Sequence, residues 1–69
     1  MRQMNKQYWP HKVVYNGDKG EGTNIALWLE ANVGRFRNRW YSVYGFLDAD
    51  DEYYFADERD MIVFILRWQ

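Results

Sequence analysis

The sequence contains no cysteine and only one histidine, His11. The lack of cysteine excludes disulfides and thiolate zinc sites, which stabilise many domains of this size. The single histidine has no recognisable serine or carboxylate partner with which to form a nucleophilic site. We therefore expect no catalytic residue, no metal and no cofactor, and the chain is predicted to be a binding protein rather than an enzyme.

Long apolar runs are also missing. No segment approaches the roughly 20 apolar residues of a membrane helix, and the polar residues 1–6 lead into no apolar stretch typical of a secretory signal. We expect a cytoplasmic protein with no membrane partner. The 69 residues allow one domain, residues 1–69, with residues 1–11 expected to form a flexible arm.

Aromatic residues, in contrast, are abundant: the chain has four Trp, six Tyr and four Phe. Each ring can bury about 150–250 Å², so a few of them can build a core at this length. A small core cannot enclose all of them. We therefore expect some rings on the surface, where aromatic patches mark binding or self-association.

The charges are unevenly distributed along the chain. Residues 1–40 carry seven Lys/Arg against three Asp/Glu, whereas residues 41–69 carry two against seven, for a net charge of −1. A dedicated duplex-DNA binder normally has a net basic surface, so this distribution argues against that function.

The first half of the chain predicts a strand over residues 12–15 and a helix over residues 24–33. Thr23 is a suitable N-cap for this helix, and Gly34 stands where a glycine commonly ends one. The expected buried stripe of the helix comprises Ile25, Trp28, Leu29 and Val33.

The second half predicts an antiparallel hairpin, with a strand from about residue 40 to 47, an acidic turn, and a returning strand over residues 52–56. The apolar run in residues 57–68 is consistent with a buried strand or a helix. A helix is favoured because Asp57 can cap it and acidic residues occupy its first turn. Its expected buried stripe comprises Met61, Phe64, Ile65 and Trp68.

These elements predict an α+β fold of order β-α-β-β-α, in which two helices cover one face of a three-stranded, mainly antiparallel sheet. The hairpin register decides which rings face outward, because a shift by one residue exchanges the two faces. The favoured register sets Leu47 opposite Tyr53 and packs Val43, Leu47 and Phe55 under the helices. The rings then expected on the uncovered face are Trp40, Tyr44 and Tyr54. Alternatively, Tyr8 and Trp9 fold across that face and cover it.

Three arginines precede the hairpin. In an extended chain Arg35, Arg37 and Arg39 share one face and can contact successive carboxylates or phosphates. Alternatively, they pair with the chain's own acidic turn or with the cluster in residues 57–60. The predicted partner-binding residues are Arg35, Arg37, Arg39, Trp40, Tyr44 and Tyr54.

Residues 54–68, YFADERDMIVFILRW, resemble the C-terminal signature of short proteins of tailed phages. Those proteins pair an aromatic strand and an acidic turn with a helix that ends in Leu-Arg-Trp or a similar sequence. Met61 departs from the pattern, in which a small alanine is expected. The resemblance implies a phage protein that is made in a bacterial cell and binds a host factor, and it implies no catalytic or ligand residues.

The leading hypothesis is a small protein-interaction module that acts through its aromatic sheet face and the arginine segment. One alternative is a single-stranded nucleic-acid binder that uses Arg35, Arg37, Arg39 and Trp40. Another is a structural component that works as a homodimer or a larger homo-oligomer. The sequence identifies no particular partner.

Overall fold

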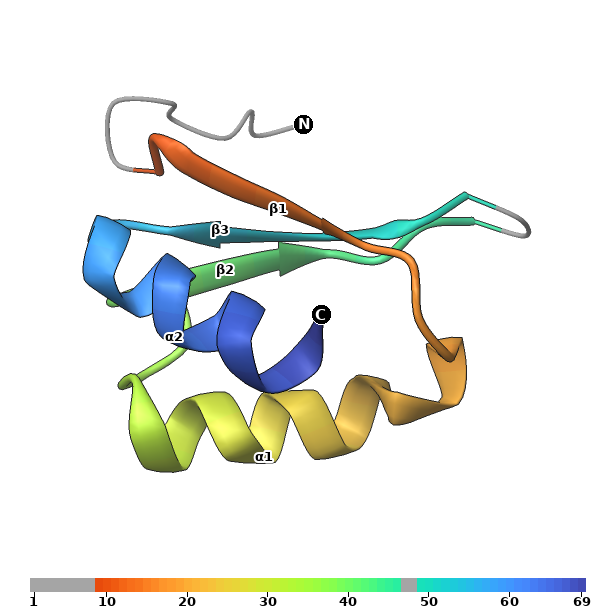
Figure 1. The fold of residues 1–69 in the computed structure, drawn as a ribbon, viewed down its shortest axis with the longest axis horizontal. Helices are drawn as coiled ribbons and strands as arrows, with labels where there is room; N and C mark the ends of the chain where they lie inside the picture. Colours follow the sequence, from red (N-terminus) through yellow and green to blue (C-terminus); the bar gives the residue numbers. More distant parts are fainter. Residues whose placement is uncertain (1–8, 47–48) are drawn as a thin grey trace.

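The computed structural model describes residues 9–46 and 49–69. Leu47 and Tyr8, to which the sequence assigned roles, lie outside the described residues. The predicted α+β order β-α-β-β-α is confirmed, with a short 3-10 turn η1 before the first helix (Figure 1). The elements are β1 (His11–Tyr15), η1 (Lys19–Glu21), α1 (Gly22–Asn32), β2 (Trp40–Val43), β3 (Asp51–Phe55) and α2 (Glu58–Trp68).

The three strands form one antiparallel sheet in the order β1-β3-β2. Both helices lie on the same side of it, as predicted, with α2 nearer to the sheet than α1 (Figure 1). Burial along β3 alternates, because Asp51, Tyr53 and Phe55 are buried while Glu52 and Tyr54 between them are only partly covered. This alternation is what a strand shows when only one face of its sheet is packed against helices.

The favoured hairpin register is wrong. Trp40 lies opposite Phe55 and Ser42 opposite Tyr53, so the even-numbered residues of β2 face the helices. Trp40 is only 3% exposed, while Val43 is on the outer face. An indole buries more apolar area than a valine side chain. Burial of Trp40 also satisfies its ring nitrogen, because Nε1–H donates to the Gly34 carbonyl at 2.9 Å.

Both predicted helices are present, with differences at their ends. The first begins at Gly22 rather than Asn24 and its N-cap is Glu21, so the prediction of Thr23 as the cap is wrong. The 3-10 turn η1 runs directly into α1, so the helix begins closer to the N-terminus than predicted. The second helix has the predicted cap: the Asp57 side chain accepts from the Arg59 N–H at 2.9 Å.

Phe64 of α2 is the point at which the elements of the core meet. It is fully buried, with its ring centroid 5.0 Å from that of Tyr53 and 5.4 Å from that of Phe55. Trp28 of α1 approaches the same ring edge-on at 6.4 Å. The neighbouring Ile65, expected in the buried stripe of α2, is exposed instead. The core comprises Val13, Tyr15, Ile25, Leu29, Val33, Trp40, Tyr53, Phe55 and Phe64.

We expect Phe64→Ala to lower the free energy of unfolding by about 3–5 kcal/mol, because it leaves a cavity among rings that cannot collapse fully. Leu66→Ala is the matched control in the same helix, since Leu66 is 81% exposed. It should change stability by less than about 0.5 kcal/mol. Urea unfolding followed by circular dichroism measures both, and equal losses would contradict the assignment of Phe64 to the core.

Candidate functional site

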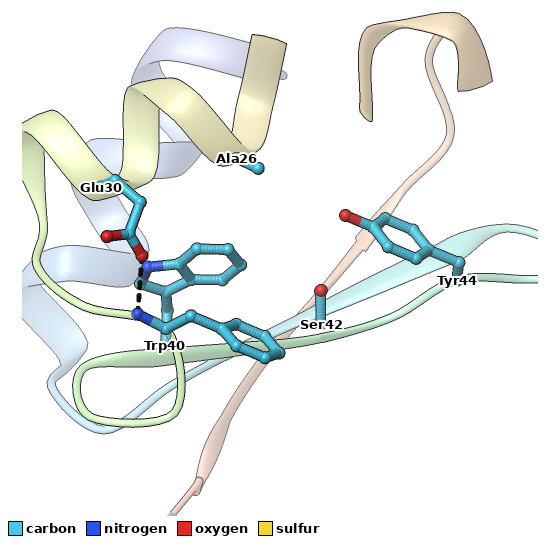
Figure 2. A pocket seen from close by; sticks show the side chains of 6 residues that line it. Ala26, Glu30, Trp40, Ser42 and Tyr44 are labelled. Atoms are coloured by element: carbon cyan, nitrogen blue, oxygen red, sulfur yellow. Dashed lines mark hydrogen bonds between the residues drawn. The ribbon is translucent and has the colours of Figure 1, made fainter. Parts of the chain in front are cut away.

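An open cleft of about 340 Å³ lies between α1 and β2 (Figure 2). Ala26 projects from α1 across from Ser42 of β2, while Trp40 lies at one end and Tyr44 at the other. The small side chain of Ala26 leaves the space that a larger residue would fill. The lining residues are Ala26, Glu30, Phe36, Trp40, Ser42 and Tyr44.

The end of the cleft near Trp40 is held in place by two hydrogen bonds. The Trp40 indole, which forms the floor, donates to the Gly34 carbonyl just after α1. The Glu30 carboxylate accepts from the backbone N–H of Phe36 at 2.7 Å (Figure 2). Phe36 packs edge-on against Trp40, with ring centroids 4.9 Å apart. These hydrogen bonds fix the Trp40 indole and the backbone of Phe36 relative to α1. The rings of Phe36 and Tyr44 nevertheless remain 42% and 55% exposed.

The cleft lies beside an edge of the sheet: among the strands of residues 9–46 and 49–69, β2 neighbours only β3, and Phe36 bridges to Trp40 at one end of that edge. The Arg39 carbonyl accepts from the N–H of Ala56, so Arg39 hydrogen-bonds on the β3 side. Backbone groups alternate in direction along an antiparallel strand, so those of Trp40 and Ser42 point to the other side. The Trp40 carbonyl confirms this direction, since it accepts from Arg37 N–H at 2.6 Å. Ser42 therefore presents its N–H and C=O along the open edge.

The three predicted arginines do not share a face. Residues 35–39 form a turn in which the N–H groups of Asn38 and Arg39 both donate to the Arg35 carbonyl at 3.0 Å. The expectation of an extended arginine segment is therefore wrong. The alternative of internal pairing is confirmed for one arginine, because Arg39 Nη2 lies 2.8 Å from Asp60 Oδ2.

Arg37 and Arg35 keep their charges available. The Arg37 backbone is left-handed (φ 71°), and its guanidinium lies 5.7 Å from the centroid of the Tyr41 ring. Arg35 is exposed. Within residues 9–46 and 49–69, neither arginine makes an ion pair. Both are neighbours of Phe36 in the sequence, and the Arg37 guanidinium lies 6.0 Å from the centroid of the Phe36 ring, on the side of Tyr41.

The outer face of the sheet carries different rings from those expected. Tyr41 is stacked between Trp9 and Phe36, at centroid distances of 6.0 and 5.5 Å. Trp9, from the segment before β1, therefore contacts this face at Tyr41, while Val43 on the same face remains 40% exposed. Tyr54 lies on the outer face, as predicted. Trp40, which was predicted to share that face, lies on the helix side instead.

The Tyr54 side chain makes a hydrogen bond to a neighbouring side chain of the same strand. Its hydroxyl donates to Glu52 Oε1 at 2.6 Å, and Lys12 Nζ lies 3.5 Å from the other oxygen of that carboxylate. Burial, reinforced by the hydrogen bond to the anionic Glu52, raises the pKa of Tyr54 to about 12. The same hydrogen bond, together with Lys12, lowers the pKa of Glu52. Tyr54 is therefore occupied by an internal contact.

Sequence reasoning thus found only part of the cleft. Trp40 and Tyr44 line it, but Ala26, Glu30, Phe36 and Ser42 were missed. Ala26 carried a signal, because a small residue beside the buried stripe of an amphipathic helix leaves space next to the sheet. Sequence reasoning also missed an aliphatic outer face of α2, whose exposed residues are Ile62, Val63, Ile65 and Leu66. The unbroken apolar run in residues 61–66 was the available signal.

Within the described ranges, no three His, Cys, Asp or Glu side chains come together as a metal site. Neither of the helices described has the length and apolar character of a membrane-spanning segment. No family model, curated protein or solved structure matches this chain.

We expect Arg39→Met to destabilise the protein by about 1–3 kcal/mol, because it leaves the buried carboxylate of Asp60 without its charged donor. Arg35→Met is the matched control, since Arg35 is exposed, and should stay within about 0.5 kcal/mol of the wild type. Denaturant unfolding at neutral pH compares the two. A cost for Arg35→Met equal to that for Arg39→Met would show that the Arg39–Asp60 pair adds nothing.

Stability should fall as the pH rises from about 10 towards 12. In this window the unfolded chain loses the Tyr54 proton while the folded chain, with its raised pKa, still holds it. Tyr54→Phe should make the fall shallower without abolishing it, because burial also raises the pKa of Tyr53. The measurement is the free energy of unfolding at several pH values. An unchanged slope in Tyr54→Phe would refute the role of this hydroxyl.

Proposed function

We propose that this chain is a small, non-catalytic protein-interaction module whose partner binds at the cleft between α1 and β2. One observation carries the proposal: an exposed hollow floored by a buried tryptophan lies directly beside the open edge of a strand. A concave, apolar site of this kind can take an anchoring side chain from a partner.

The surroundings of the cleft support a protein partner. Tyr44 and Phe36 contribute exposed rings, and the Arg37 guanidinium lies 6.0 Å from the centroid of the Phe36 ring. Aromatic residues and arginine are the types enriched at protein interfaces, where a polar rim surrounds an apolar centre. Of the residues predicted from the sequence, this proposal retains Arg35, Arg37, Trp40 and Tyr44.

The resemblance to short phage proteins extends this proposal to a biological setting. On that basis the partner is a host factor and the protein acts in the bacterial cytoplasm. Both statements are predictions that a partner recovered from bacterial lysate would test directly.

A second candidate, binding of single-stranded nucleic acid, is favoured by one specific arrangement. The rings of Trp9, Tyr41 and Phe36 stack in sequence, and the Arg37 guanidinium lies against the last two. Phe36 is exposed, and Trp9 and Tyr41 are partly buried. Accessible aromatic rings with a neighbouring cation are a known platform for stacked bases. This site differs from the predicted one, because Trp40 is buried on the other side of the sheet. Strongly salt-dependent binding of labelled oligonucleotides, lost in Arg37→Ala, would support it.

We expect Ala26→Trp to abolish partner binding, because the indole would occupy the cleft. Ala31→Trp is the matched control: it makes the same change in the same helix, at an exposed position outside the cleft. Each variant is immobilised, exposed to bacterial lysate, and its retained proteins are quantified by mass spectrometry. A specific partner should be depleted on the order of tenfold or more by Ala26→Trp, as expected when a hot-spot pocket is lost.

The two variants must first show the same circular dichroism spectrum as the wild type. The proposal fails if every retained protein is captured equally by Ala26→Trp and Ala31→Trp.

A further inference from the structure

We infer that the cleft receives an extended peptide segment of the partner, which adds as a strand to the open edge of β2. One large apolar side chain of the segment enters the cleft, and an acidic residue contacts Arg35 and Arg37. The inference rests on the proposed function and names the class of partner at the same site.

The backbone of β2 favours an extended partner. Ser42 directs its N–H and C=O along the open edge, and a strand laid beside it would satisfy both groups. A helix docked in the same place would leave them unpaired with the partner. The chain itself already uses this edge once: Phe36 forms a parallel bridge with Trp40, through the Arg37 N–H and the Trp40 carbonyl.

The position of the cleft matches the side chains of such an added strand. Every second side chain of a strand points to the same face of its sheet. On the helix-covered face, the residue beside Ser42 would point into the space opposite Ala26, which is the cleft (Figure 2). Backbone pairing and filling of the cleft are therefore satisfied by one segment in one register. Phe36 at one end and Tyr44 at the other limit the segment to a few residues.

The charges near Phe36 specify an acidic segment. Arg35 and Arg37 flank Phe36, and neither makes an ion pair in the part of the chain that is described. The one carboxylate that lines the cleft, Glu30, already accepts from the Phe36 N–H. Arg39 is paired with Asp60. The Arg37 guanidinium lies 6.0 Å from the centroid of the Phe36 ring, so a carboxylate at the Phe36 end of the segment would complement its charge.

The test uses short, blocked peptides of alternating threonine and valine, with a central Phe, Leu, Ile or Trp and an aspartate at each end. Binding to the isotopically labelled full chain is followed by NMR. At least one aspartate peptide should bind saturably, roughly tenfold more tightly than its lysine counterpart. N-methylation of the backbone beside the central residue should weaken binding by about fivefold to tenfold.

Two further readouts locate the peptide. Hydrogen exchange at the Ser42 amide should slow in the complex, and Ala26→Trp should remove binding while Ala31→Trp keeps it. The inference is overturned if no aspartate peptide binds, or if binding leaves Ser42 exchange unchanged. Neither result would refute the proposed function, because a folded partner could still depend on Ala26. That function fails separately, when no lysate protein distinguishes the two tryptophan variants.

Discussion

The hydrogen bond between the Trp40 indole and the Gly34 carbonyl ties the end of α1 to the start of β2, and most other features follow from it. It directs the largest ring of the hairpin towards the helices. That orientation places Trp40 and Ser42 on the helix side of the sheet, together with Tyr53 and Phe55 of β3. It also provides the floor of the cleft, so the packing that stabilises the fold and the surface that would meet a partner share one side chain.

The order and type of the elements were predictable because they depend on local signals. The periodicity of α1, the aspartate cap of α2 and the turn residues of the hairpin each act over a few positions. The register of the hairpin was not predictable, because the two alternatives differ in which apolar residues are buried and both give an amphipathic sheet. The choice depends on a bond from Trp40 to a carbonyl that lies outside the hairpin. The greater apolar area of Trp40 was a signal within residues 40–56, whereas its hydrogen bond to the Gly34 carbonyl was not.

In the candidate site too, residues that stand out in the sequence were predicted, whereas residues that matter only through tertiary contacts were not. Trp40 and Tyr44 were identified as interaction residues because aromatic side chains stand out in a sequence, but Trp40 contributes as a buried floor rather than as an exposed ring. Ala26 and Ser42 are inconspicuous residues, and they matter only because α1 and β2 bring them to opposite sides of a gap (Figure 2). The arginines were expected in an extended segment, whereas a left-handed residue at Arg37 folds them into a turn. Such a turn is uncommon for a residue other than glycine, asparagine or aspartate, so sequence preferences point away from it.

The strand order β1-β3-β2 has a consequence for how the protein is made. The two strands that leave the ribosome first are never neighbours, because the third inserts between them. Until residues 51–55 have emerged, neither β1 nor β2 has its native strand partner. Native pairing of all three strands therefore depends on residues 51–55.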